Sequence, residues 1–375
     1  WREIALTDVA DADTEQPGDS YWDSDQVRWF YFKSSGMKQT SSTNKTINGR
    51  KYGFDEWGRM IADWHAATAN NADNELSRRG SMNNATVDAT KAYARDFMYF
   101  SSPEDGARFT KGWFKVVPGY YLNYKDYDDG TDRWYYANGD GKIAAGEIKA
   151  IKGKKYAFDL KGGMISGLAL LRTNGREISE YADSDGKYDS QDSFETTARG
   201  LSGDWGFYYF SDNEDKDGSM KTGNQRITLD GTSFTFSFRK GGTRKGQGIN
   251  GLNEKKYYLG GMLMTADADT KIELLNKNTL EKITVDKFIR TNGLVGKDVT
   301  SGKVGQANKG EVVYTDGTTG TTGEATGLDI TSLTSNYVVI NVSGNVVKSG
   351  SKVDGDGYKV GLDGNNNVKQ IIGTN

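Results

Sequence analysis

Short aromatic runs dominate the hydrophobic pattern of this chain, and each run ends in a glycine-rich turn. The clearest run is Trp134-Tyr135-Tyr136, which is followed by the step Asn138-Gly139. Both positions of such a step tolerate positive φ, so the step is a strong signal for a two-residue hairpin turn. Aromatic side chains alternate with other residues at the period of two that is typical of a strand. The pattern therefore predicts β-hairpins.

The hairpin pattern recurs with a period of about 21 residues, as a fixed-period repeat of stacked supersecondary units does. An apolar residue follows each turn, and pairs of these residues are separated by 23, 21, 42 and 21 positions. The pairs are Met37 and Met60, Ile143 and Met164, Met220 and Met262, and Val347 and Val368. The sequence thus predicts an all-β fold, a repetitive β-hairpin solenoid of aromatic and glycine-rich units with a short helical insertion.

The repeats are interrupted, which divides the chain into segments. A short helix is expected over Val87–Phe97, with Thr86 as its N-cap. The predicted segments are an acidic flank (1–27), hairpin repeats (28–64), a partly helical insertion (65–96), hairpin repeats (97–171), an acidic insertion (172–200), hairpin repeats (201–265), an irregular segment or linker (266–324) and degenerate C-terminal hairpin repeats (325–375).

Composition narrows the classes of function. Apolar residues make up 35% of the chain, while 48 glycines and 21 tyrosines favour a narrow aromatic core with tight turns. The net charge of −3 argues against nucleic-acid binding, and no apolar run approaches the length of a membrane span. The absence of cysteine excludes disulfides, thiolate nucleophiles and cysteine-ligated zinc.

Catalytic and metal-binding patterns are weak. A serine–histidine mechanism would depend on His65, the single histidine, and no Gly-x-Ser-x-Gly elbow is present, so we expect no enzyme activity. The loop from Asn213 through Asp215 and Asp217 opens like a calcium loop, which makes a calcium site there a hypothesis. The twelfth position is Asn224 in place of glutamate, and turns built from Asp and Gly are the alternative.

Several repeats carry a family resemblance. The segments Gly112-Trp113, Trp134-Tyr135-Tyr136, residues 151–159 and residues 218–223 resemble the cell-wall-binding repeats of Gram-positive surface proteins. That superfamily includes choline-binding modules of wall hydrolases, glucan-binding repeats and the receptor-binding repeats of clostridial toxins. The resemblance implies hairpins that stack into a superhelix, with ligands bound between neighbours.

The resemblance also implies candidate binding residues. It places Trp113 beside Trp134 and Tyr136, with Tyr156 arriving from the next unit. A weaker second set is Trp29, Tyr52 and Trp64. Aromatic faces of this kind recognise either a quaternary ammonium group or the C–H face of a sugar. The Gly-Trp pair of a choline site is kept only at Gly112-Trp113; Asp63-Trp64 matches in part, while Gly167-Leu168 and Gly223-Asn224 lack the indole. Glycan binding and plain packing between hairpins therefore stay open.

From these observations we expect a non-catalytic protein or fragment on the extracellular bacterial cell surface. Its expected partner is an envelope polymer, a wall glycan or teichoic acid, and self-association is compatible with the sequence. The alternatives are a structural stalk or self-assembling surface protein, the targeting tail of a hydrolase or toxin, and an adhesin directed at a host.

Overall fold

The computed structural model describes residues 1–5, 27–55, 58–66, 94–119, 122–182, 188–212, 217–292, 294–297, 304–305, 312–315, 330–348 and 350–374. Strands dominate these residues and helices are few and short, which agrees with the predicted all-β class. The chain divides into two compact units. The first unit comprises Trp1–Ala182 and Phe210–Met220, and the second comprises Asp183–Tyr209 and Lys221–Asn375.

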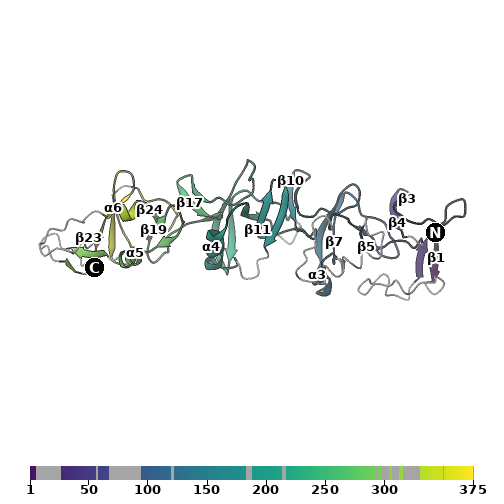
Figure 1. Cartoon of the computed structure of the whole chain (residues 1–375), viewed down its shortest axis with the longest axis horizontal. Coiled ribbons are helices and arrows are strands. Elements are labelled where there is room, and N and C mark those ends of the chain that lie inside the picture. Colours follow the sequence, from purple (N-terminus) through teal and green to yellow (C-terminus); the bar gives the residue numbers. More distant parts are fainter. Residues whose placement is uncertain are drawn as a thin grey trace. The chain divides into compact units, whose positions relative to one another are not determined.

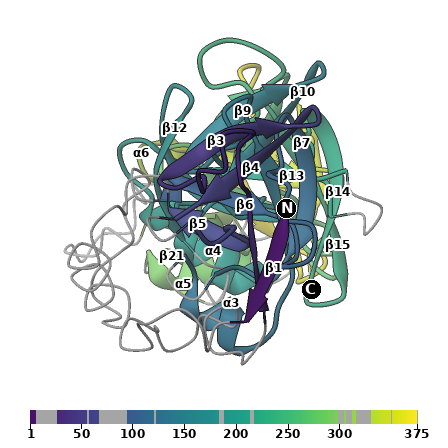
Figure 2. The ribbon, with the colours of Figure 1, turned by 90° about the vertical axis from the view of Figure 1, so that its right-hand side faces the viewer.

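The first unit is a succession of antiparallel hairpins, which can be followed in Figure 1. One short helix, α3 (Tyr124–Asp128), lies in the fourth hairpin. The hairpins pair β1 (Arg2–Ala5) with β2 (Val27–Phe30), β3 (Ser42–Ile47) with β4 (Arg50–Phe54), β5 (Asp63–Ala66) with β6 (Phe97–Phe100), β7 (Gly112–Val116) with β8 (Arg133–Ala137), β9 (Glu147–Ile151) with β10 (Lys154–Phe158), and β11 (Gly167–Asn174) with β12 (Glu177–Ala182). The pair β3 and β4 lies side by side in Figure 2.

The connector that follows one hairpin pairs with the preceding hairpin in the sequence. After the second hairpin, Met60 N donates to Trp29 O (2.8 Å), and after the fifth, Met164 N donates to Trp134 O (2.8 Å). The same relation appears as bridges between Phe30 and Arg59, Tyr52 and Ala107, and Met98 and Lys142. Consecutive hairpins in this unit are therefore joined by backbone hydrogen bonds as well as by side chains.

A side-chain oxygen closes the turn that opens most of these connectors. Asp159 Oδ1 accepts backbone N–H groups from Lys161 (2.8 Å) and Gly163 (2.9 Å). Asn138 Oδ1 accepts from Asp140 (2.9 Å) and Lys142 (3.1 Å) in the same way. Asp and Asn favour such turns because the short side chain satisfies amides two and four residues ahead.

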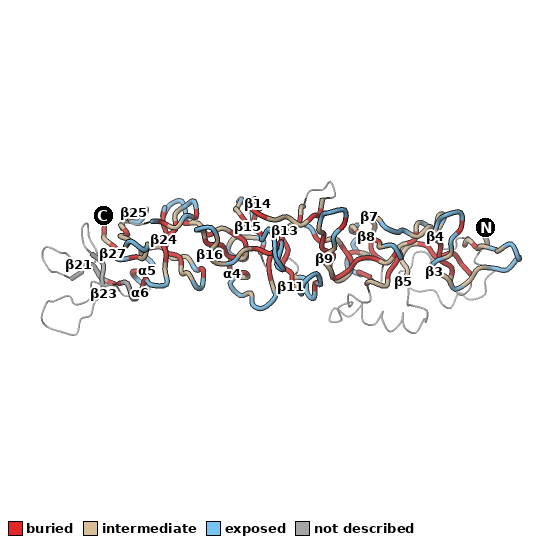
Figure 3. The backbone as a smooth tube through the Cα atoms, turned by 90° about the horizontal axis from the view of Figure 1, so that it is seen from above, coloured by how far each residue is buried: buried red, intermediate tan, exposed pale blue. Residues whose placement is uncertain are grey.

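The core of the first unit is thin and aromatic. Figure 3 shows buried positions recurring along its strands. In β4 and β10 the pattern is the same, with a buried Tyr and a buried Phe two residues apart, which is the alternation expected for one face of a strand. Tyr52 and Phe54 supply this pair in β4, and Tyr156 and Phe158 supply it in β10.

The second unit begins with α4 (Gln191–Gly200), whose N-cap Ser190 forms a capping box with Ser193. Its first sheet has the order β14-β15-β18-β17-β16. The strands of this part are β13 (Trp205–Phe210), β14 (Gly223–Leu229), β15 (Thr232–Phe238), β16 (Gly251–Asn253), β17 (Lys256–Leu259) and β18 (Met262–Leu263).

The rest of the second unit packs two sheets and two helices around one apolar cluster. The sheets have the orders β20-β19-β24 and β22-β21-β23-β27-β26-β25. The elements are β19 (Ile272–Asn276), β20 (Lys282–Ile283), α5 (Val285–Thr291), β21 (Leu294–Lys297), β22 (Val304–Gly305), β23 (Val312–Thr315), α6 (Thr331–Thr334), β24 (Tyr337–Asn341), β25 (Gly350–Val353), β26 (Tyr358–Leu362) and β27 (Val368–Gly373).

Three expectations about organisation need revision. The acidic insertion expected over 172–200 forms the end of β11, β12 and α4, and β1 lies inside the expected N-terminal flank. The irregular segment expected over 266–324 contains β19, β20 and α5. Helix α5 forms because the Thr284 hydroxyl caps its N-terminus and because Val285, Phe288 and Ile289 form one buried face. Most of the predicted helical insertion, residues 67–93, lies outside the described residues.

The side chain that closes the connector turn gives a first prediction. Asp159→Ala removes an acceptor of two backbone N–H groups, and we expect the free energy of unfolding to fall by about 1 to 3 kcal/mol. Urea unfolding followed by tryptophan fluorescence reports on the first unit, since seven of the eight tryptophans lie within residues 1–182. Asp159→Asn keeps the accepting oxygen and is the matched control. An equal loss in both variants would contradict this account of the turn.

Candidate binding site

Three aromatic rings from two consecutive hairpins meet in the first unit around Trp113. Trp113 in β7 lies directly opposite Tyr136 in β8, and Tyr156 comes from β10 of the next hairpin. The indole centroid is 5.2 Å from that of Tyr136 and 4.8 Å from that of Tyr156. Both phenol rings make steep angles with the indole, 68° and 66°. Three such sets occur in the described part of the first unit, and we number them along the sequence. Trp113, Tyr136 and Tyr156 are the third trio.

The same arrangement occurs at the N-terminal end of the described chain. Trp1 precedes β1, whose register with β2 places it opposite Tyr31, and Tyr52 comes from β4. The Trp1 centroid is 5.5 Å from Tyr31 and 5.0 Å from Tyr52, with interplanar angles of 65° and 67°. These residues are the first trio, and they reproduce the geometry of the third within a few tenths of an ångström.

A second trio lies between them along the sequence. Trp64 in β5 is opposite Tyr99 in β6, and Tyr135 comes from β8. The indole centroid is 5.2 Å from Tyr99 and 4.8 Å from Tyr135. The angles are 59° and 72°. One indole and two phenols thus recur three times at equivalent positions of the hairpins.

A fourth ring distinguishes the first and third trios from the second. Phe54 lies 5.7 Å from Trp1, and Phe158 lies 5.6 Å from Trp113. In the second trio the position of this fourth ring is held by Ala137. Ala137 faces Gly112 at the start of β7, just as Phe158 faces Glu147 at the start of β9. Ala137 supplies no ring, and Phe114 of β7 instead stacks on Tyr99 at 5.1 Å and 11°.

The second trio contains the most completely buried ring of the three trios. Tyr135 has no exposed surface, and burial raises the pKa of its hydroxyl. The Trp64 indole N–H donates to the backbone carbonyl of Val117 (2.8 Å), which satisfies its polar atom inside the protein. In the third trio Trp113 and Tyr136 are half-buried, and Trp1 of the first trio is 40% exposed. Trp64 and Tyr99 of the second trio are half-buried as well, and Tyr52 and Tyr156 are buried, so the trios differ most clearly at the exposed Trp1 and the fully buried Tyr135.

The remaining predicted ligand-binding residues stand next to the trios. Trp134 alternates with Tyr135 in β8, lies opposite Lys115 and is half-buried. Trp29 holds the matching position in β2, opposite Glu3, and packs against the cluster that contains Tyr52. The main-chain carbonyls of both tryptophans accept the connector hydrogen bonds described above. Of the leading predicted set, the trio geometry brings together Trp113, Tyr136 and Tyr156.

Four members of the trios were not predicted from the sequence, namely Trp1, Tyr31, Tyr99 and Tyr135. A signal for Tyr31 exists, because residues 28–31 (Arg-Trp-Phe-Tyr) match residues 133–136 (Arg-Trp-Tyr-Tyr). Residues 47–55 match 151–159 in the same way, 104 positions later. Comparing these segments, instead of single 21-residue units, would have indicated Tyr31 and Tyr52 as counterparts of Tyr136 and Tyr156.

The second unit keeps the backbone of a trio but not its rings. Gly223 faces Phe238 as Gly112 faces Ala137, so Asn224 and Ser237 hold the positions of the indole and the first phenol. Only the third ring of a trio, the phenol from the next hairpin, has a counterpart here, Tyr257 in β17. Two of the three walls are therefore absent, as the missing indole at Gly223-Asn224 indicated.

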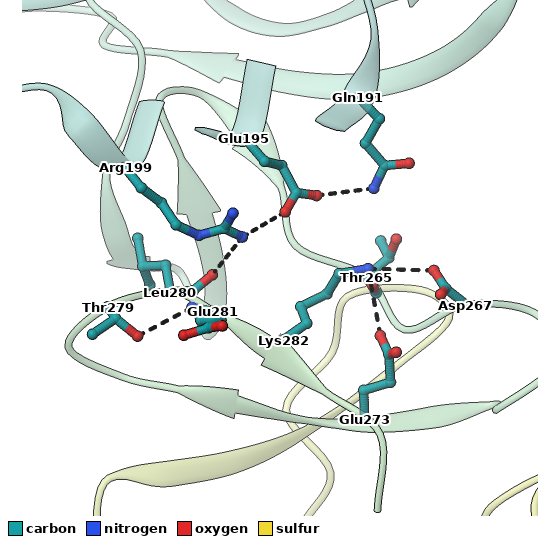
Figure 4. A network of polar contacts seen from close by, with 10 residues as sticks. All are labelled: Gln191, Glu195, Arg199, Thr265, Asp267, Glu273, Thr279, Leu280, Glu281 and Lys282. Atoms are coloured by element: carbon teal, nitrogen blue, oxygen red, sulfur yellow. Dashed lines mark hydrogen bonds and ion pairs between the residues drawn. The ribbon is translucent and has the colours of Figure 1, made fainter. Parts of the chain in front are cut away.

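The second unit also contains a polar network, formed by side chains of α4, β19, β20 and the connector after β18 (Figure 4). The Lys282 ammonium donates to Thr265 O (3.0 Å) and lies 3.3 Å from Asp267 and 3.4 Å from Glu273. Nearby, Glu195 of α4 pairs with Arg199. One ammonium thus stands between two carboxylates, and these contacts join the connector after β18 to β19 and β20.

Metal-binding residues are not assembled in the part of the chain that the structure describes. No group of three or more histidine, cysteine or acidic side chains gathers there. Of the predicted calcium ligands, Asn213 and Asp215 lie outside the described residues. Asp217 forms an ion pair with Lys154 (3.1 Å).

His65 and Asp63 are the perturbed titratable groups of β5. His65 lies beside Phe100, and burial lowers its pKa to about 4. Burial, with a smaller contribution from Glu104, raises the pKa of Asp63 to about 6. Asp63 has a φ of 51°, a left-handed conformation that Asn tolerates and Gly adopts freely.

The raised pKa of Asp63 predicts a pH dependence of stability. The folded chain holds the Asp63 proton more tightly than the unfolded chain does, so stability falls as pH rises from about 4 through about 6. We expect Asp63→Asn to raise the melting temperature at pH 7.5 and to change it little at pH 4. Thermal unfolding at both values tests this, and an equal shift at the two would contradict it.

Comparison with known proteins finds solved structures but neither a family model nor a curated protein that matches. Choline binding protein F from Streptococcus pneumoniae is 16% identical, over 64% of this chain and 55% of that chain, with a TM-score of 0.35. CbpJ from Streptococcus pneumoniae TIGR4 is 14% identical over 98% and 99%, with a TM-score of 0.33. The modular autolysin LytC from Streptococcus pneumoniae is 16% identical over 77% and 48%, with a TM-score of 0.27. The chain thus spans about half of the first and the last of these proteins.

Proposed function

We propose that this chain is a non-catalytic bacterial surface protein that attaches to an envelope polymer through its aromatic trios. The ligand is a compact quaternary ammonium group carried by the polymer, as on a choline-substituted teichoic acid. The observation that carries this proposal is the repeated angle between the rings, 59° to 72° in all three trios.

Rings at steep angles form the walls of a corner, which suits a compact cation. A quaternary ammonium group cannot donate hydrogen bonds, so a protein holds it by surrounding it with aromatic faces, each worth about 0.5 to 2 kcal/mol. A sugar instead needs one flat ring with polar groups around it to fix the hydroxyls. The walls of the third trio are an indole and two phenols, with Phe158 behind them. A glycan is therefore the second candidate ligand.

The connectors support a solenoid of stacked hairpins within the first unit. Connector residues form bridges with the preceding hairpin, as Ala107 does with Tyr52 and Lys142 with Met98, and each trio takes two rings from one hairpin and one from the next. A stack of this kind repeats one weak site along a polymer, and linked weak sites can raise avidity by a factor on the order of 10² to 10⁴.

The non-catalytic and extracellular parts of the proposal have separate support. His65, with its pKa lowered to about 4, lies against Phe100 in the hairpin core and is poorly suited to proton transfer near neutral pH. Among the described residues no helix is long and apolar enough to cross a membrane. The absence of cysteine is compatible with export.

Retention on intact Gram-positive sacculi tests the proposal. We expect purified chain to be retained on choline-containing sacculi, to be released by free choline, and to be lost when teichoic acid is stripped. Retention that survives both treatments would instead favour wall glycan. No retention on either preparation would overturn attachment and leave a structural stalk, with all trios serving as core.

A substitution in the third trio sharpens this test. We expect Trp113→Ala to lower the affinity for sacculi by about tenfold, since one aromatic wall is lost. Trp205→Ala, in β13 of the second unit and a member of no trio, is the matched control and should keep the affinity. Affinity is measured per folded molecule, with circular dichroism of each variant. Equal losses in the two variants would contradict a site at Trp113.

A further inference from the structure

The residue that faces the third ring of each trio differs among the three copies. Across the hairpin, Lys45 faces Tyr52, Phe114 faces Tyr135 and Lys149 faces Tyr156. Residues directly opposite in an antiparallel pair project to the same side of the sheet, so each of these side chains stands on the face that carries the trio. We call Lys45, Phe114 and Lys149 the gate residues.

In the first trio the gate residue places a cation over an aromatic wall. The Lys45 ammonium lies 5.9 Å from the ring centroid of Tyr31, within the range of a cation–π contact. The protein's own ammonium therefore uses the surface that a ligand cation would use. A second cation would have to displace Lys45 or bind beside a like charge.

In the second trio the gate residue is itself a ring. Phe114 stacks on Tyr99 (5.1 Å) and also lies against Tyr135 (5.7 Å) and Trp64 (5.8 Å). It contacts all three walls, so the space between them is filled by side chain. This agrees with the complete burial of Tyr135.

In the third trio the gate residue is held away by a neighbour. Lys149 donates to Glu147 Oε1 (3.1 Å), two residues earlier on β9 and on the same face. In the described part of the chain, no ammonium or guanidinium lies over the ring of Tyr136. Glu147 faces Phe158 across its hairpin. In the hairpin that supplies Tyr52 to the first trio, Ser42 faces Phe54, so Ser42 holds the position equivalent to that of Glu147. Serine offers Lys45 no charge.

We propose that the gate residue decides whether a trio accepts a cationic ligand: Lys45 occupies the first, Phe114 fills the second, and Glu147 opens the third by holding Lys149. This inference rests on the proposed binding of quaternary ammonium groups and adds to it which trio binds. Glu147 is a positioning residue that acts through Lys149. The three copies of one aromatic motif then supply one open site, one self-occupied site and one core.

Methionine methyl groups report on the first and the third trio separately. Met60 lies in the apolar cluster that packs against Tyr31, and Met164 packs against the same cluster as Trp113 and Tyr136, which contains Tyr156. The full chain, labelled with ¹³C in its methionine methyl groups, is titrated with tetramethylammonium and followed by NMR. We expect the Met164 signal to shift at a midpoint about tenfold below that of Met60.

Charge-removing variants move these midpoints in opposite directions. Glu147→Gln frees Lys149 and should raise the Met164 midpoint about tenfold, and Glu147→Gln with Lys149→Gln should restore it. Lys45→Gln should lower the Met60 midpoint about tenfold. The matched controls are Glu180→Gln, which breaks an exposed ion pair with Arg172, and Lys51→Gln, next to Tyr52 but on the other face of β4.

The outcomes separate this inference from the proposed function. Shifts at both methionines with equal midpoints, unchanged in Glu147→Gln and Lys45→Gln, would overturn the gate and leave cation binding intact. Midpoints that change equally in the control variants would overturn it too, as an effect of net charge. No shift in any variant, together with no retention on sacculi, would overturn cation binding and the gate with it.

Discussion

At the start of several connectors one side chain accepts backbone hydrogen bonds, and these bonds constrain the rest of the first unit. Asp159 and Asn138 each satisfy two amides of a five-residue turn, and Asn341 and Asp363 do the same in the second unit. The turn returns the chain at a fixed point, so that the next residue can bridge the preceding hairpin. A hairpin alone is marginally stable in water, and this added backbone pairing stabilises a stack whose core is only a few rings thick.

The fixed register of the hairpins then determines which rings meet. Trp113 faces Tyr136 because Gly112 faces Ala137, and a slip of one residue would turn every ring of the strand to the other face. The connector between β8 and β9 places the next hairpin so that Tyr156 lies against the same indole. The ring geometry is therefore a consequence of backbone pairing, which explains why three copies with different sequences agree so closely in distance and angle.

The sequence predicted the hairpins and the third trio because both depend on local patterns within a few tens of residues. Trp113, Tyr136 and Tyr156 lie within 44 positions, and alternation assigns their faces. The sequence predicted the first and second trios only in part. Trp1 pairs with Tyr31 of the first trio, and Trp64 with Tyr99 of the second, each across a long gap in the sequence. No local pattern reports such pairings. Helices α4 and α5 were missed for a different reason: each is short, and its signal is a cap with a few apolar residues.

Counting aromatic motifs overestimates the number of binding sites in a chain of this kind. A thin core needs large flat side chains for its own stability, so an indole with two phenols recurs wherever hairpins stack. What differs between copies is the side chain beside the rings. A lysine, a phenylalanine and an ion-paired lysine stand at the same register position, and they produce three environments from one set of walls. Recognition can therefore change by substitution at one cross-strand position while the rings that stabilise the fold stay in place.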